Sequence, residues 1–288
     1  MITTATKGTR GVAVRAGLHR GWLETKYSLT DVGDIFWMLL FPVSFTVTLL
    51  FMRGNTVPGT DLALGAMVLP SLIGMSIAFG GLAGPAMQIA TDREDGTLLR
   101  AKATPDGMLG YLIGKIWFFG LTTLASLVLL AIPALTVIGD LRIDGRTALL
   151  LPVIFVVGMV ATVPIGSALG SIFKSSAQSM LIMLASMLLI AISGIFYPIT
   201  AMPPWLQWVG QIFPFYWLGL GTRSAMMPAG AEAAEIGDSW RTVEMFGVLG
   251  VWAVVGLVLA PIVLRRMARR QTGSAIAAAR DKVMTRGY

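Results

Sequence analysis

Six long apolar runs limit what this chain can fold into more than any other feature of its sequence. Each run has roughly the 20 or more residues that a helix needs to cross about 30 Å of hydrocarbon. The mean hydropathy of the chain is +0.76 and 13% of its residues are charged, whereas a typical soluble domain has about 25%. The sequence therefore predicts an all-α membrane protein with six transmembrane helices, at residues 34–52, 62–90, 110–138, 149–173, 178–200 and 244–264.

Basic residues are distributed unevenly around these runs. Six spans place both termini on one side of the membrane, and most of the 22 Lys and Arg residues fall on that side. Because cytoplasmic connections carry the excess of Lys and Arg, both termini are expected in the cytoplasm. The basic residues lie beside apolar runs, which favours membrane lipid as a partner and argues against nucleic acid. The opposite side has Arg53, Arg142, Arg146, Arg223 and Arg241.

The chain is expected to have three parts. Residues 1–33 form a cytoplasmic tail and an interfacial helix, because apolar and charged side chains alternate there without the continuous apolar core of a signal peptide. Residues 34–266 form the six-span transmembrane domain. Residues 267–288 form a basic cytoplasmic tail.

A charged segment at residues 91–107 separates the second run from the third. Its sequence, TDREDGTLLRAKATPDG, is typical of a short amphipathic helix that ends at a Thr-Pro pair. Glu94 and Asp95 are expected at the positive end of the dipole of this helix. Leu98 and Leu99 are expected to offer an apolar knob to a partner. The alternative is a solvated loop without a partner.

A second unusual segment, at residues 202–217, is rich in aromatic residues and is bounded by prolines. The part from Trp205 to Phe213 is too short to span a membrane. We expect it to form one or two helical turns that dip into the outer leaflet, with its aromatic rings at the headgroup level. The alternative is an aromatic anchor with no role in transport. A solvated outer loop is expected after it, with the acidic residues Glu232, Glu235 and Asp238.

Several kinds of chemistry are missing from the sequence. Gly110, Gly114 and Lys115 resemble part of a phosphate-binding loop, but their spacing is wrong and Ile116 stands where magnesium needs Ser or Thr. These glycines are expected to serve helix packing instead. Without Cys and with one His, the chain offers neither disulfides nor an imidazole cluster. Between their boundary residues the six runs contain no Asp or Glu for a proton-driven carrier, so energy for transport is expected from a partner.

Small and flexible residues recur within the runs. Met180, Met183 and Met187 lie at helical spacing in the fifth run. One interpretation is core packing; the other is that they and Gln88 border an adaptable apolar cavity without fixed charge, suited to a hydrophobic or amphiphilic substrate. Close helix packing is the expected role of two glycine pairs with four-residue spacing, Gly80/Gly84 and Gly166/Gly170.

In their order and spacing, three features resemble the membrane subunit of a type-2 ABC transporter. This six-span permease family includes bacterial drug, lipid and polysaccharide exporters, and the resemblance covers nearly the whole chain. The features are the interfacial helix, the cytoplasmic Arg93-Glu94-Asp95-Gly96-Thr97-Leu98 with Thr104-Pro105, and the outer segment from Tyr197-Pro198 through Met202-Pro203-Pro204-Trp205-Leu206-Gln207 to Phe213-Pro214 and Arg223.

The resemblance implies how such a protein is assembled. The chain itself would be no enzyme and would bind no cofactor or metal. A second permease, identical or a sister chain, and two separate ABC ATPase subunits that hold ATP and magnesium would complete the transporter in the inner (plasma) membrane of a bacterium. Leu99 departs from the family pattern, since many members have Glu there.

The resemblance also implies roles for particular residues. The segment 91–105 would be the cytoplasmic coupling helix, and the interfacial helix at residues 12–30 would complete the ATPase contact. The ATPase-coupling residues would be Glu94, Asp95, Gly96, Thr97, Leu98, Thr104 and Pro105. The outer re-entrant hairpin would contain Pro198, Pro203, Pro204, Trp205 and Pro214.

The expected function is export of a drug-like or lipid-like molecule by alternating access, driven by the separate ATPase. Three alternatives stay open at this point. They are a permease for a polysaccharide or glycolipid, a non-transporting membrane scaffold or sensor, and a stand-alone carrier, against which the missing carboxylates argue.

Overall fold

The computed structural model describes residues 5–51, 54, 64–94, 96–104, 106–137, 144–173 and 176–270, and every regular element within these ranges is helical. Two short 3₁₀ turns, η1 (Ile199–Ala201) and η2 (Ala231–Ala234), lie in the last third of the chain. The α-helices are α1 (Ala5–Ser28), α2 (Val32–Phe51), α3 (Leu64–Glu94), α4 (Thr97–Lys102), α5 (Gly107–Val137), α6 (Gly145–Ile172), α7 (Ser176–Ala191), α8 (Pro204–Ile212), α9 (Pro214–Met226) and α10 (Thr242–Arg270).

Helix length and composition confirm an all-helical chain with several membrane-spanning segments. Among the described residues, five helices are long and apolar enough to cross a membrane: α2, α3, α5, α6 and α10. The run predicted at residues 178–200 is different, because α7 ends at Ala191. Gly194, with φ 66, and Pro198 then turn the chain away from the helix axis. The apolar helix in that run is therefore shorter than the other five.

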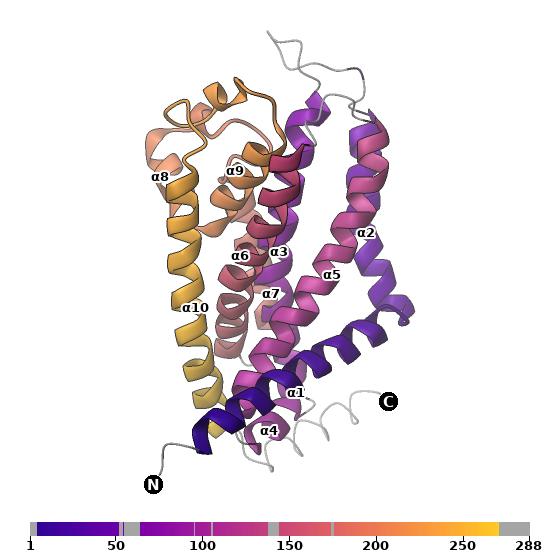
Figure 1. Cartoon of the computed structure of the whole chain (residues 1–288), viewed down its shortest axis with the longest axis vertical. Helices are drawn as coiled ribbons and strands as arrows, with labels where there is room; N and C mark the ends of the chain where they lie inside the picture. Colours follow the sequence, from indigo (N-terminus) through magenta and orange to yellow (C-terminus); the bar gives the residue numbers. More distant parts are fainter. Residues whose placement is uncertain are drawn as a thin grey trace.

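The helices form an elongated bundle in which α9 lies inside (Figure 1). All 13 residues of α9 are buried, and the helix packs against α3, α6 and α10. Close packing depends on glycine, as expected. A Cβ atom at Gly166 would lie 2.3 Å from the backbone oxygen of Leu82, and one at Gly170 would lie as close to the backbone of α3. Gly80 and Gly84 of α3 instead face side chains of α5.

The N-terminal helix α1 crosses one end of the bundle obliquely and packs on the beginning of α5 (Figure 1). Glycines on both helices bring the two backbones together. A Cβ atom at Gly17 would lie 2.3 Å from the oxygen of Gly110, and one at Gly21 would lie 2.6 Å from the oxygen of Gly114. This contact confirms that Gly110 and Gly114 serve helix packing. We call this end of the molecule, which also contains α4, the α4 end.

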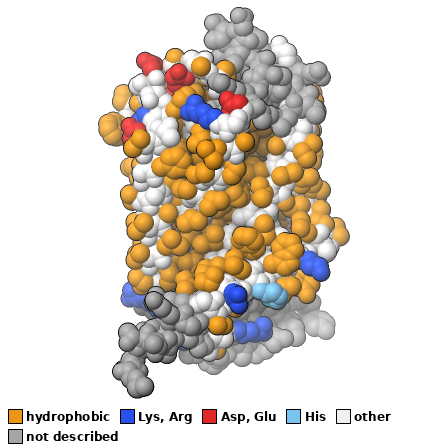
Figure 2. Space-filling model, viewed as in Figure 1, with side chains coloured by type: hydrophobic (Ala, Val, Ile, Leu, Met, Phe, Trp, Pro, Cys, Tyr) orange, Lys and Arg blue, Asp and Glu red, His pale blue; other side chains and the backbone are white. Residues whose placement is uncertain are grey.

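The surface is that of a membrane protein. On the face drawn in Figure 2, hydrophobic side chains cover the middle of the molecule, and charged side chains gather toward its two ends. Large apolar residues on α2 and α10 are strongly exposed, including Phe36, Phe51, Val254 and Ile262. Such a continuous apolar belt suits contact with lipid rather than with water.

The proline-rich segment after α7 forms two helices where the sequence predicted one short piece. α8 exposes Trp205, Trp208 and Ile212 on one face. Phe213, extended at φ −98 and ψ 154, ends α8, and Pro214 begins α9. The second helix was not predicted from the residues themselves, although the resemblance implies a hairpin at this place.

Candidate functional site

α4 is a short helix between α3 and α5 (Figure 1). Gly96 precedes it with φ 72, a left-handed conformation that glycine adopts without strain. The helix therefore begins at Thr97. Glu94 is the last residue of α3, which corrects its predicted place at the start of the short helix. Asp95 and Pro105 lie outside the described residues.

Leu98 contradicts the prediction that it offers an apolar knob to a partner. Its side chain is 0% exposed and packs in an apolar cluster of this chain that includes Ile89, Met108, Leu112 and Leu264. These residues come from α3, α5 and α10. Leu98 therefore anchors α4 to the bundle. We call this group of residues the α4 anchor.

The surface that α4 leaves for a partner is mostly polar. Arg100, Lys102 and Thr104 are exposed, whereas Thr97 and Leu99 are partly exposed. A partner that approaches this end of the molecule thus meets positive charge and hydroxyl groups, with one leucine among them.

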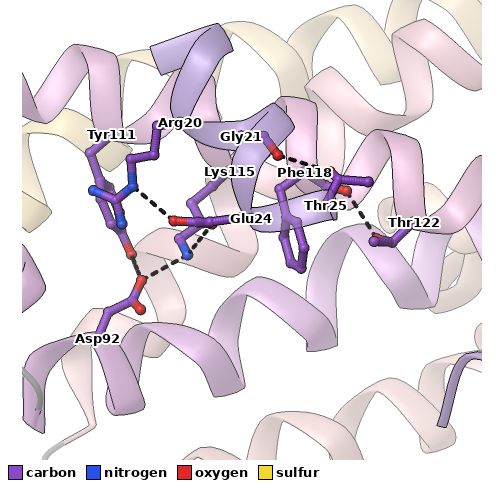
Figure 3. Close-up of polar contacts among 9 residues, drawn as sticks. All are labelled: Arg20, Gly21, Glu24, Thr25, Asp92, Tyr111, Lys115, Phe118 and Thr122. Atoms are coloured by element: carbon purple, nitrogen blue, oxygen red, sulfur yellow. Dashed lines mark hydrogen bonds and ion pairs between the residues drawn. The ribbon is translucent and has the colours of Figure 1, made fainter. Parts of the chain in front are cut away.

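Charged side chains of α1, α3 and α5 meet where these three helices pack together (Figure 3). Lys115 of α5 is 1% exposed, and its Nζ lies 3.0 Å from Oε2 of Glu24 on α1 and 2.9 Å from Oδ2 of Asp92 on α3. Tyr111 donates a hydrogen bond of 2.6 Å to the same oxygen of Asp92. Arg20 Nε donates one of 2.8 Å to Oε1 of Glu24. We call this set of five side chains the Lys115 cluster.

The Lys115 cluster fixes α1 to α3 and α5. Burying an ammonium group costs free energy unless the group is paired. The two carboxylates compensate the charge of Lys115, and the ion pairs hold the three helices together. Asp92 contradicts the expectation that the spanning helices lack a carboxylate, since α3 continues to Glu94 instead of ending near residue 90. Its charge is compensated by Lys115, unlike the free carboxyl group of a proton carrier. Sequence reasoning missed the cluster because its members are distant in the chain.

Arg93 makes a second connection at the α4 end. Its Nη2 donates a hydrogen bond of 2.6 Å to the backbone oxygen of Ser171, and its Nη1 donates to that of Phe173. Nη2 also lies 2.5 Å from the sulfur of Met267 on α10. The guanidinium therefore satisfies carbonyl groups at the C-terminal end of α6, where the helix dipole favours a cation. Adjacent residues of α3 thus bind α5, α6 and α10.

A cavity of about 710 Å³ lies between α2, α3, α5 and α7. Gln88 and Met187 line it, as predicted. Met180 and Met183 are not among its lining residues, and Met180 is 55% exposed on the outside of α7. The methionine spacing thus identified the correct helix, but only its last methionine faces the cavity.

The lining of the cavity is aromatic and carries one fixed charge. Among the described residues that line it are seven aromatic side chains, from Trp37 to Phe196, and the carboxylate of Asp34. Asp34 corrects the prediction of a cavity without fixed charge. It was missed because residue 34 was taken as the first residue of an apolar run, whose position relative to α3 and α5 the sequence does not reveal.

A buried ion pair lies at the opposite end of the bundle. Arg223 Nε of α9 lies 2.6 Å from Oε1 of Glu235, and both side chains are almost fully buried. Arg223 Nη1 also donates hydrogen bonds to Ser71 Oγ, at 3.1 Å, and to the oxygen of Gly194, at 3.3 Å. The prediction that Glu235 belongs to a solvated loop is therefore wrong. The pair connects α9 to α3 and to the turn after α7.

The residues predicted for the outer segment lie at the same end of the bundle as this ion pair. Pro198 and Pro203 precede η1 and α8, and Pro204 and Pro214 are the first residues of α8 and α9. Proline suits these positions, since it fixes φ and needs no hydrogen-bond acceptor in a first helical turn. Trp205 is 66% exposed.

The bundle of long apolar helices and its apolar surface define a multi-pass membrane protein, and the cavity lies between its helices. Residues 41–262 match the family described as ABC-2 family transporter protein. The chain belongs to this family, and it is the permease, the transmembrane subunit without ATPase motifs. Permeases of this family generally pair with ABC ATPase subunits. A comparison with curated proteins finds no match.

Proposed function

We propose that this permease exports a hydrophobic or amphiphilic molecule that binds in the cavity between α2, α3, α5 and α7. The observation that carries this proposal is the size and chemistry of the cavity. About 710 Å³ falls within the range of drug-sized sites, and the lining is mainly aromatic and aliphatic. A polysaccharide would need many more hydrogen-bonding groups than this lining offers.

The α4 end is where the separate ATPase subunits bind. This assignment is supported by the position of α1 and α4 at one end of the bundle and by the exposed polar residues of α4. Glu94, Asp95, Gly96, Thr97, Thr104 and Pro105 form the coupling segment. Leu98 belongs to it as the residue that anchors the helix. ATP and magnesium bind to the partner subunits.

Force from the ATPase reaches the cavity through rigid contacts. The α4 anchor connects α4 to α3 and α5, and the Lys115 cluster connects α1 to the same two helices. Both α3 and α5 line the cavity. A push on α1 and α4 therefore moves two walls of the cavity as semi-rigid bodies, which alternates its access between the two sides.

The remaining features of the assembly follow from the same proposal. α7 and the turn after it form the sixth crossing, and α8 with α9 forms the outer re-entrant hairpin, supported by the burial of α9 and the exposed tryptophans of α8. Both termini lie in the cytoplasm of a bacterium, and two permeases, identical or sister chains, share two ATPases. The three-part division at residues 33 and 266 is retained.

Reconstituted transport tests the proposed function. The full chain would be purified with its ATPase from the producing cells and placed in liposomes. We expect a dansyl-labelled amphiphile to move across the vesicle wall when ATP is supplied, and not with a non-hydrolysable analogue. Equal movement under both conditions would show that the chain is a scaffold or an independent carrier.

A further inference from the structure

Asp34 is the only charged side chain among the residues described as lining the cavity. It lies in the first turn of α2, where the helix dipole stabilises a carboxylate. Within the described ranges this carboxylate takes part in no ion pair, whereas Asp92 and Glu235 each pair with a buried cation.

Polar groups along the cavity offer hydrogen-bond acceptors. The hydroxyl groups of Ser76 and Thr122 donate to the backbone oxygens of Leu72 and Phe118, at 2.8 and 3.0 Å. Their hydrogens are therefore occupied, and their lone pairs are left for a ligand. Oε1 of Gln88 is buried without a hydrogen-bond partner in the described structure. A ligand with N–H donors would satisfy these oxygens.

Aromatic rings complete the environment of a cation. Trp37, one turn after Asp34, lines the cavity together with Phe41, Phe45 and Phe79. The faces of aromatic rings attract cations, and indole attracts them most strongly. A carboxylate, acceptor oxygens and ring faces thus share one cavity, and none of its described lining residues is Lys or Arg.

We propose that the cavity selects amphiphiles that carry an ammonium group with N–H donors, with Asp34 as the counter-charge. The ammonium group lies at the Asp34 end of the cavity, and the apolar part of the molecule lies among the aromatic rings. This inference rests on the proposed function, because it names the class of substrate for the same cavity. An amine drug and a lipid with an ethanolamine headgroup share this chemistry.

A matched pair of fluorescent probes tests the selection. Monodansylcadaverine carries a primary ammonium group, and its N-acetyl derivative is neutral and otherwise the same. Both would be titrated against the full-length permease in nanodiscs of phosphatidylcholine. We expect the ammonium probe to bind about fivefold more tightly, as for an exposed ion pair assisted by an aromatic ring. Equal affinities for the wild type would overturn the inference.

Variants at two carboxylates locate the effect. Asp34→Asn should remove the preference for the ammonium probe without changing the affinity for the neutral one, and Asp34→Glu should retain it. Asp31→Asn is the control, since Asp31 lies outside the cavity lining and caps the backbone N–H of Asp34, a role that Asn also performs. A preference that survives in Asp34→Asn, or that disappears equally in Asp31→Asn, would overturn the assignment to Asp34.

Two further arms separate the sources of the ligand and the two proposals. Phosphatidylethanolamine added to the nanodiscs displaces the ammonium probe if a lipid amine is the natural occupant, and leaves it bound if a soluble amine is. ATP-driven transport with no ammonium preference would overturn this inference and leave the proposed function intact. An ammonium preference without ATP-driven transport would overturn the proposed function instead.

Discussion

Replacing Leu98 by Ala should loosen α4 from the bundle. Burial of Leu98 is complete, and Leu→Ala at such sites costs about 2–5 kcal/mol. α4 has six residues, and helices shorter than about 12–15 residues are marginal alone. Its stability therefore depends on the packing of Leu98 in the α4 anchor. A loss of about 3 kcal/mol raises the population of undocked α4 roughly a hundredfold, since about 1.4 kcal/mol is a factor of ten.

Hydrogen exchange measured by mass spectrometry reports this population directly. Peptides that cover residues 97–104 would be followed in the full-length permease, in nanodiscs and without ATPase. We expect exchange about a hundredfold faster in Leu98→Ala. Leu99→Ala is the matched control, since Leu99 has the same side chain on the same helix but is partly exposed, and its exchange should accelerate less than about tenfold.

The two roles considered for Leu98 make opposite predictions in this assay. If Leu98 were a docking knob for the ATPase, its truncation would leave exchange in the isolated permease unchanged and weaken only the complex. Unchanged exchange in Leu98→Ala, or equal acceleration in Leu99→Ala, would therefore refute the conclusion that Leu98 anchors α4 to the bundle.

Three stability predictions follow, each checked by thermal unfolding of the purified chain in detergent. Lys115→Met should lose about 3 kcal/mol, because it leaves two carboxylates without their buried partner, and a change under about 0.5 kcal/mol would show that water already compensates them. Glu235→Gln should lose a similar amount by removing the counter-charge of a buried guanidinium, whereas its exposed neighbour Asp238→Asn should change stability by less than about 0.5 kcal/mol. Gly166→Ala should lose about 1–3 kcal/mol by overpacking against a backbone carbonyl, and Gly250→Ala, with open space at its Cβ position, should lose nothing; equal effects would refute the packing argument.

Hydropathy predicted most of the membrane helices because the signal is local. The run at 34–52 matches α2, Val32–Phe51, and the run at 149–173 matches α6, Gly145–Ile172. The α3 boundary was wrong for a reason that is not local. Its last turns contain Asp92, whose charge is compensated by Lys115 of another helix. From the sequence alone, such a charge indicates the end of an apolar span.

The site was less predictable than the fold, because burial depends on partners far along the chain. The sequence marks the segment around Leu98 as amphipathic, but which leucine faces inward is decided by residues of α3, α5 and α10. Glu235 has the sequence surroundings of a surface loop, and only the position of Arg223 inside the bundle reveals its burial. Gln88 and Met187 were predicted correctly, but helical spacing grouped Met187 with Met180 and Met183, which do not line the cavity.

The number of substrate molecules moved per ATP hydrolysed tests the central claim, that ATPase motion reaches the cavity through α4. It would be measured in liposomes that contain the permease with its ATPase, for the wild type and Leu98→Ala. We predict that the variant complex still assembles and hydrolyses ATP but moves several-fold fewer dansyl probe molecules per ATP. An unchanged ratio, with α4 shown to be undocked by hydrogen exchange, would contradict the claim.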